Sequence, residues 1–300
     1  MRLVVFGQNG QLAQALRSVC SNMAVPPVYL GRAQCDVTNA AQVADCLKLL
    51  KPNAVINTAA YTAVETAEAQ IAQATALNAQ APQMLAEITS RLNIALLHLS
   101  TDYVFDGTKS APYVENDAPN PLNVYGRSKL KGEEAVRDRN PEALIIRTSW
   151  VFSPFAHNFV RTILQRAAKG EALSVVDDQI GTPTAALDLA EACVRAIKAK
   201  LDGSKASGIY HYASSGETSW FGLANAILQH TQAWRDTNEV ALTAIGSEQF
   251  KTQAVRPKNS RLNSEAFVRQ FGHRQPTWQE SLAGTLSLLE TEFSAKWRAP

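Results

Sequence analysis

The N-terminal stretch constrains the fold of this chain more than any other part of the sequence. A continuous apolar run, Leu3 to Phe6, leads into Gly7-Gln8-Asn9-Gly10, and a helical pattern through Leu16 and Val19 follows. An uninterrupted apolar run is typical of a strand buried on both faces of a sheet. The order of strand, glycine-containing turn and helix therefore predicts the first unit of an alternating α/β fold.

The same alternation continues to about residue 150. Apolar runs that predict strands are Val28–Leu30, Ala54–Asn57, Ile94–Leu99 and Leu144–Ile146, with helical patterns around Val43–Leu50, Asn78–Ile88 and Tyr125–Val136. Strands separated by helices favour a parallel sheet with right-handed crossovers. We therefore expect an α/β fold with a Rossmann-like, doubly wound parallel sheet.

The alternation is less regular after Trp150. Predicted elements there are a helix over His157–Ala168, a strand over Leu173–Val176, a helix over Leu187–Ile197, a strand over Gly208–Tyr212 and a helix over Trp220–Leu228. Longer loops between them indicate a smaller C-terminal α/β lobe that covers a substrate. We assign residues 1–150 and about 183–213 to the nucleotide-binding domain, and about 151–182 and 214–300 to the lobe.

Composition excludes several classes of function. The 300 residues are 46% hydrophobic and carry a net charge of +2, which gives no reason to expect nucleic acid or a membrane surface as partner. The four cysteines are scattered without a C-x-x-C pair, which argues against a zinc site or a disulfide framework and fits a reducing compartment. No uncharged run reaches membrane-spanning length, so we expect a cytoplasmic protein.

The first glycine turn has the chemistry of a dinucleotide site. Gly7 permits a tight turn, and Gly10 lets the backbone approach a pyrophosphate at the N-terminus of the following helix. Ala13 takes the third small position, where close packing of helix on strand is needed. The alternative is an ordinary turn between strand and helix, but the position directly after the first strand favours the nucleotide.

The second strand bears on the choice of cofactor. It ends at Gly31-Arg32, and no acidic residue stands from Leu30 to Ala33 to accept a ribose 2′-hydroxyl. Arg32 could instead meet a 2′-phosphate, which predicts NADPH. The alternative is that Arg32 is a solvated surface side chain.

Two segments carry the candidate chemistry. Tyr125 and Lys129 stand four apart, so on a helix they share a face. An ammonium beside a phenol lowers the phenol pKa from about 10 and prepares it for proton transfer. The fourth strand delivers Ser100 and Thr101 at its C-terminal end, where a doubly wound sheet binds its ligands. A Tyr and a Lys four apart also occur on many solvated helices, so the pair alone is a weak signal.

Two other residues stand at or near strand ends. Trp150 follows the fifth strand, where its ring is either the wall of a substrate site or part of the core. His98 lies inside the fourth strand, which favours a hydrogen-bonded core histidine over a catalyst.

Together these motifs resemble the extended short-chain dehydrogenase/reductases, and among them the dTDP-4-dehydrorhamnose reductases. The resemblance covers nearly the whole chain. Its motifs are Gly7 to Leu12, Asn57 to Val64, Ser100 to Phe105, Pro121 to Lys129, Arg147 to Val151, Asp178 to Thr184 and Arg256 to Asn263.

The resemblance implies reduction of the C4 ketone of dTDP-6-deoxy-L-lyxo-4-hexulose to dTDP-L-rhamnose, with NADPH or NADH as cofactor. Tyr125 would protonate the C4 alkoxide, Lys129 would lower the tyrosine pKa and hold the nicotinamide ribose, and Thr101 would hydrogen-bond the ketone. The implied sugar contacts are Ser100, Thr101, Tyr103 and Trp150. The implied cofactor contacts are Gly7, Gly10, Gln11, Leu12, Arg32, Asp36, Val37, Ala59, Ala60, Tyr61, Tyr125 and Lys129.

Some members of the family have an acidic residue in the first helix that joins a metal-bridged dimer. Ala15 stands at the matching place, so no metal is expected, although a homodimer is compatible with the resemblance. Two other functions compete with the reductase. One is another extended short-chain enzyme on a nucleotide sugar, either an epimerase or a different 4-ketoreductase. The other is a non-catalytic regulatory subunit with the same fold.

Overall fold

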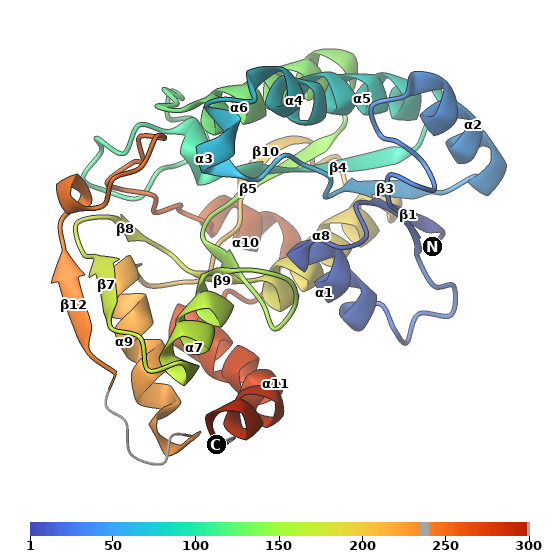
Figure 1. Ribbon diagram of the computed structural model, residues 1–300. Helices are drawn as coiled ribbons and strands as arrows, with labels where there is room; N and C mark the ends of the chain where they lie inside the picture. The colour runs from blue at the N-terminus through green and yellow to red at the C-terminus, as the bar shows by residue number, and fades with distance from the viewer. Residues whose placement is uncertain (235–239, 299–300) are drawn as a thin grey trace.

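A six-stranded parallel sheet forms the centre of the larger part of the molecule (Figure 1). The computed structural model describes residues 1–234 and 240–298. The strand order is β10-β5-β4-β3-β1-β2, which confirms the predicted Rossmann-like, doubly wound sheet. Its strands are β1 (Leu3–Phe6), β2 (Val28–Leu30), β3 (Ala54–Asn57), β4 (Ala95–Thr101), β5 (Leu144–Thr148) and β10 (Gly208–His211).

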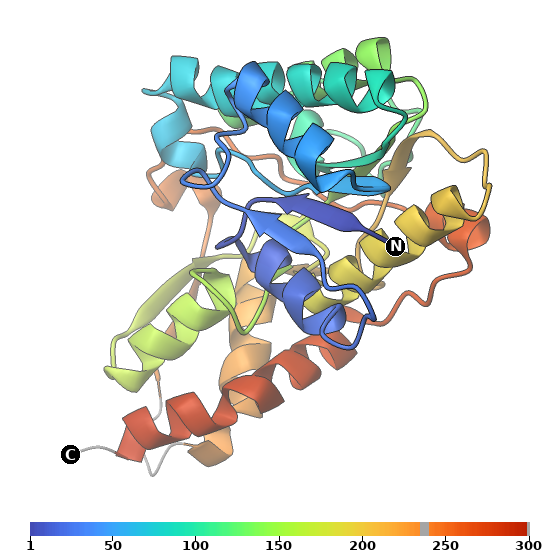
Figure 2. The ribbon, with the colours of Figure 1, turned by 90° about the vertical axis from the view of Figure 1, so that its right-hand side faces the viewer.

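Helices cover both faces of this sheet (Figures 1 and 2). One face carries α1 (Gln11–Val19), α8 (Ala186–Leu201) and α10 (Glu265–Phe271). The other carries α2 (Ala40–Leu50), α3 (Val64–Ala67), α4 (Ile71–Thr75), the π-helical turn η1 (Ala76–Gln80), α5 (Ala81–Arg91) and α6 (Val124–Arg139). Along β1, Val5 packs with the α1 side and Val4 and Phe6 with the other, which explains the continuous apolar run.

The strand order reverses at β1. Strand β2 lies on one side of β1, and β3 and the later strands follow on its other side. Gly7 follows β1 with φ of +92°, and a Cβ there would lie 2.6 Å from Thr58 Oγ1. That hydroxyl donates to the Phe6 carbonyl over 2.7 Å. Only glycine fits this close approach, and ligands of open α/β sheets bind where the strand order reverses.

A second group of elements lies beside the sheet and has its own apolar core (Figure 1). Phe152, Leu164, Leu223 and Leu286 are all buried in that core. Its helices and strands are β6 (Val151–Phe152), α7 (Phe159–Ala168), β7 (Leu173–Val176), β8 (Ile180–Gly181), β9 (Thr184–Ala185), β11 (Thr218–Ser219), α9 (Trp220–His230), β12 (Leu242–Ile245) and α11 (Trp278–Arg298). The helices α10 and α11 were not predicted from the sequence.

Several bounds differ from the sequence expectation. Strand β4 extends to Thr101, so Ser100 and Thr101 end the strand instead of following it. Helix α7 begins at Phe159, because the Asn158 side chain caps it by accepting from Arg161 N over 3.2 Å. None of the helices in the described part of the chain combines the length and the apolar character that crossing a membrane requires.

Candidate active site

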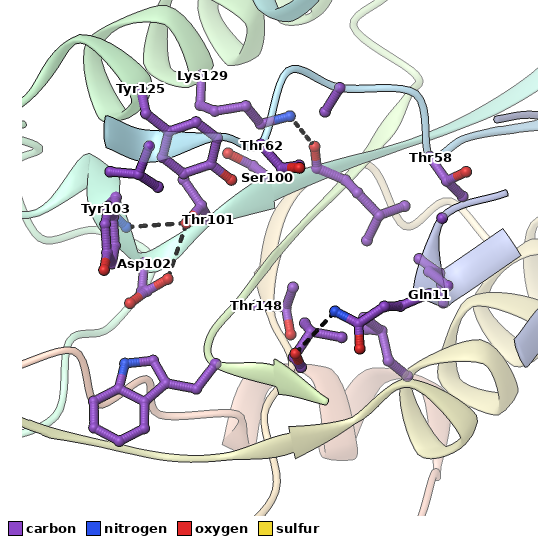
Figure 3. A pocket seen from close by; sticks show the side chains of 18 of the residues that line it. Gln11, Thr58, Thr62, Ser100, Thr101, Asp102, Tyr103, Tyr125, Lys129 and Thr148 are labelled. Carbon is purple, nitrogen blue, oxygen red and sulfur yellow. Dashed lines mark hydrogen bonds between the residues drawn. The ribbon is translucent and has the colours of Figure 1, made fainter. Parts of the chain in front are cut away.

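A cavity of about 730 Å³ opens at the C-terminal ends of β1, β3, β4 and β5 (Figure 3). It brings together segments that are far apart in the sequence, as expected at this edge of a doubly wound sheet. The lining residues that the sequence analysis had selected are Gly10, Gln11, Leu12, Ala59, Ala60, Ser100, Thr101, Tyr103, Tyr125, Lys129 and Trp150.

Helix α6 presents Tyr125 and Lys129 to the cavity one turn apart, as predicted. Asn123 caps the helix by accepting a hydrogen bond from Gly126 N over 2.8 Å. Gly126 lets the helix approach the short 3₁₀-helix η2 (Asp102–Val104), because a Cβ at this position would lie 2.1 Å from Tyr103 O. The ring of Tyr103 meets that of Tyr125 edge-on, with 5.8 Å between the centroids.

The expected lowering of the Tyr125 pKa is not found in this structure. Burial raises the pKa of Tyr125 to about 12, and only a hydrogen bond with Thr101 acts in the opposite direction. The prediction was wrong because it considered the ammonium and not the loss of solvent around the phenol. The phenol is therefore fully protonated at neutral pH, which suits a proton donor.

Lys129 is buried and directed toward the end of β4. Its Nζ donates to the Leu99 carbonyl over 2.5 Å and lies 3.5 Å from His98 Nε2. Burial lowers the pKa of Lys129 to about 8, against a smaller opposing effect of Glu133. His98 is itself buried, lies 3.1 Å from Asn57 Nδ2 and has its pKa lowered by burial, in keeping with a neutral core histidine.

Thr101 forms a small cluster with its neighbours at the end of β4. Its hydroxyl donates to Asp102 Oδ1 over 2.9 Å and accepts from Tyr103 N over 3.2 Å (Figure 3). Burial raises the pKa of Asp102 to about 7, and raises that of Tyr103 above its ordinary value. Asp102 lines the cavity, although the sequence analysis did not select it.

The glycine turn leaves the start of α1 open to a ligand. Gly10 is the N-cap and no side chain caps the helix, so the first amides of α1 keep their donors. A Cβ on Gly10 would meet no atom within 4 Å, which leaves room beside these donors. Donors at a helix N-terminus fit a diphosphate, and the residues present therefore fit a dinucleotide.

Two hydrogen bonds of the Gln11 side chain connect the start of α1 to the segment after β5. Its Nε2 donates to the Val151 carbonyl over 3.1 Å, and its Oε1 accepts from Ser153 Oγ over 2.9 Å. The loop that follows brings Ala156 and His157 to the cavity.

Trp150 is both a cavity wall and a packed side chain. It stacks on Trp220 with 3.6 Å between the ring centroids and 9° between the planes, and both residues line the cavity. Its φ of +47° is a strained value for a bulky residue, which directs attention to function. Trp220 begins α9, and nothing in the sequence pattern marked it as a partner of Trp150.

Some predicted cofactor residues do not line the cavity: Gly7, Arg32, Asp36, Val37 and Tyr61. Gly7 shapes the turn, while Val37 is buried in the core between sheet and helices. The Tyr61 hydroxyl bonds to Gln70 and lies 2.9 Å from Thr66 Oγ1.

Arg32 is held by an acidic neighbour on the surface. Its side chain is 90% exposed and its Nε donates to Asp36 Oδ2 over 3.2 Å. Hydrogen bonds from the Thr38 hydroxyl and amide are the largest causes that lower the pKa of Asp36. The charge on Arg32 is therefore partly balanced before any 2′-phosphate is considered.

The remaining lining residues were not selected as site residues, although Ala13 was placed in the glycine turn and several others lie within the motifs given above. They are Ala13, Asn57, Thr58, Thr62, Ala63, Val64, Leu99, Asp102, Thr148, Val151, Ala156, His157, Leu189 and Trp220. Those next to strand ends could have been found, because parallel strands end at one edge of the sheet. Leu189 and Trp220 depend on contacts between distant segments and carry no local signal.

A doubly wound sheet, a helix N-terminus open to a dinucleotide and a Tyr–Lys pair beside Thr101 define an extended short-chain dehydrogenase/reductase. A family model described as RmlD substrate binding domain matches residues 1–291. The chain belongs to this family, the dTDP-4-dehydrorhamnose reductases.

Individual relatives agree over almost the full length. A dTDP-4-dehydrorhamnose reductase of Sinorhizobium fredii is 41% identical over 283 residues, covering 94% of this chain and 95% of the relative. The crystal structure of one from Clostridium acetobutylicum has a TM-score of 0.89 at 34% identity and covers 97% of this chain and 100% of its own. One from Bacillus anthracis in complex with NADP has a TM-score of 0.89 at 32% identity, with 96% and 99% covered.

Proposed function

We propose that this chain reduces the C4 ketone of dTDP-4-dehydro-L-rhamnose to dTDP-L-rhamnose with NADPH or NADH. The observation that carries the proposal is that Thr101, Tyr125 and Lys129 line the same cavity as the first turn of α1. The proposed proton donor and the proposed dinucleotide site therefore line the same cavity. The relatives named dTDP-4-dehydrorhamnose reductase, one of them crystallised with NADP, support the substrate and cofactor classes.

The cofactor would lie across the C-terminal ends of β1 and β3. Its diphosphate would meet the open amides of α1 near Gly10 and Gln11, and the small residues Ala59 and Ala60 would let it lie close to the sheet. When bound, the reduced nicotinamide supplies the hydride. The protein orients the reactants and manages the proton.

Tyr125 is the proton donor in this proposal. A ketone that gains a hydride becomes an alkoxide, which is a much stronger base than a phenolate. Because burial raises the pKa of Tyr125 to about 12, its hydroxyl keeps its proton at neutral pH until the alkoxide forms. Thr101, next to Tyr125, would help to hold the ketone oxygen.

Lys129 is not among the groups that shift the pKa of Tyr125. Its ammonium would instead place a positive charge near the oxygen on which negative charge develops during hydride transfer. With a pKa of about 8, Lys129 is mostly charged at neutral pH. We also assign it the nicotinamide ribose.

The sugar would lie between the end of β4 and the stacked indoles. Ser100 and Tyr103 line one side, and Trp150 with Trp220 lines another. An aromatic surface packs well against the apolar face of a deoxysugar and excludes water from the reacting atoms.

The test is a coupled reaction. dTDP-glucose 4,6-dehydratase and the 3,5-epimerase generate the substrate, NADPH absorbance is followed, and the sugar product is identified. Oxidation with formation of dTDP-L-rhamnose is the expected result. Net consumption of NADPH also excludes an epimerase, which recycles its cofactor. Bound NADPH without oxidation would contradict the proposal.

The Tyr125→Phe variant tests the proton donor. It is expected to lower kcat by about a hundredfold or more, as loss of a general acid does, with NADPH binding nearly intact. Tyr29→Phe is the matched control, because the Tyr29 hydroxyl is buried without a hydrogen-bond partner and lies outside the cavity lining. Turnover of Tyr125→Phe near that of the control would remove Tyr125 from the mechanism.

A cytosolic location and a homodimer belong to the same proposal. The four cysteines are free, as a reducing compartment requires. Light scattering after size-exclusion chromatography measures the mass of the particle, and a value near 32.6 kDa would contradict the dimer.

A further inference from the structure

Asp102 is a buried carboxyl group beside a proposed catalytic hydroxyl. The residue is 3% exposed, and Oδ1 lies 2.9 Å from Thr101 Oγ1. Its other oxygen, Oδ2, is buried and has no hydrogen-bond partner of good geometry. Oδ2 lacks a well-aligned donor, and burial of the carboxyl group outweighs the hydrogen bonds that favour its charged form.

The hydrogen bonds of Thr101 depend on the protonation of Asp102. A threonine hydroxyl has one hydrogen and two lone pairs, and one lone pair accepts from Tyr103 N over 3.2 Å. If Asp102 is charged, the Thr101 hydrogen is committed to Oδ1 and cannot serve a ketone. If Asp102 is neutral, its own O–H can donate to the second lone pair, and the Thr101 hydrogen becomes free.

The surroundings supply little positive charge to hold Asp102 ionised. The side chains that face it from its own segment, from α6 and from the C-terminal segment are hydroxyls and phenols: Thr101, Tyr103, Tyr125 and Ser260. The backbone amides of Asp102 and Tyr103 are the other donors to the carboxyl group. Burial dominates and raises the pKa of Asp102 to about 7, with Ser260 and Thr101 opposing it.

Charged groups near this cluster form contacts with other residues, although Arg256 Nε is buried without a hydrogen-bond partner. Arg256 and Glu65 act on Tyr103 and pair with each other over 2.7 Å. Lys129 donates to the Leu99 carbonyl. The balance therefore leaves Asp102 able to exist as a neutral acid near physiological pH.

We propose that Asp102 is a positioning residue whose neutral form donates to Thr101 Oγ1 and so turns the Thr101 hydrogen toward the substrate ketone. Thr101 and Tyr125 would then both donate to one oxygen, which stabilises the charge that develops there. Ionised Asp102 reverses this: it takes the Thr101 hydrogen and leaves a lone pair that draws the Tyr125 hydroxyl away. The inference rests on the proposed reductase.

Protonation of Asp102 favours activity in this arrangement. As pH rises through the Asp102 pKa, the productive arrangement is lost and kcat/KM falls, by at most tenfold per pH unit. The midpoint in the free enzyme is expected near pH 7. Deprotonation of Lys129 adds a second fall near pH 8.

The Asp102→Asn variant distinguishes the fall of kcat/KM near pH 7 from the fall near pH 8. An amide has nearly the shape of the neutral acid and donates to Thr101 at every pH. The variant is expected to keep at least about a third of the wild-type kcat/KM measured at pH 6, and to move the fall from near pH 7 to near pH 8. An unchanged midpoint, or a hundredfold loss at all pH values in a folded variant, would overturn the inference.

Two substitutions, Thr101→Val and Thr101→Ser, test whether Asp102 acts through the Thr101 hydroxyl. Valine removes the hydroxyl, so kcat/KM should fall about 10²–10³-fold, as when one oxyanion donor is lost, and the step near pH 7 should vanish. Serine keeps the hydroxyl and should keep that step. If Thr101→Val retained the step, Asp102 would not act through Thr101, even if Asp102→Asn failed to fold. An inactive wild type would instead contradict the proposed function.

Discussion

Gly126→Ala is the substitution whose consequence can be worked most directly from distances. The added Cβ would lie 2.1 Å from the carbonyl oxygen of Tyr103 and 3.0 Å from Pro121 Cβ. Ordinary contacts begin at 3.4 Å, so helix α6 or the Tyr103 backbone must move by about 1.3 Å, the difference between the two distances. Neither obstacle is a flexible side chain, so the shift cannot be avoided.

The helix that must move carries Tyr125 and Lys129. A displacement of about 1 Å in a catalytic group costs on the order of 10²-fold in rate, so kcat should fall about a hundredfold. Overpacking should also lower the free energy of unfolding by about 1–3 kcal/mol. In the proposed binding mode NADPH is held mainly by α1 and the end of β3, so its Kd should change little.

The assay measures kcat at saturating NADPH and sugar nucleotide, together with thermal melting and the Kd of NADPH. Gly284→Ala is the matched control, because α11 offers no atom within 4 Å of the new Cβ. It should keep wild-type activity and gain up to about 1 kcal/mol from helix propensity. A folded Gly126→Ala variant with kcat within threefold of wild type would refute the close positioning of α6.

Three further predictions concern other parts of the molecule. Glu133→Gln leaves Arg147 buried without its carboxylate partner, now 2.6 Å away, and should lower the free energy of unfolding by about 3–5 kcal/mol in urea titrations; a loss below about 1 kcal/mol would contradict this. Arg32→Ala should lower the ratio of kcat/KM for NADPH over NADH, and an unchanged ratio would remove Arg32 from cofactor choice. Trp150→Ala should raise KM for the sugar nucleotide more than the Kd of NADPH, whereas the reverse would make Trp150 a core residue.

Local sequence patterns were enough for the fold and for selecting Thr101, Tyr125 and Lys129, which line one cavity. The apolar runs gave β1, β2, β3 and β7 with the bounds found in the structure. The spacing of Tyr125 and Lys129 placed them one turn apart on α6. These features depend on residues close in the chain, and the period of side chains along a strand or helix reports them directly. The strand ends then located the site, because parallel strands end at one edge.

Tertiary structure decided what depends on solvent and on distant contacts. Burial, and not Lys129, controls the pKa of Tyr125, because removing water from a phenol outweighs a charge directed toward another acceptor. The stack of Trp150 on Trp220 joins residues seventy positions apart, which no local pattern encodes. Asp102 was not selected from the sequence, and only its burial beside Thr101 gives its protonation a consequence. Sequence specifies which groups the chain carries, whereas packing decides how much water each one keeps.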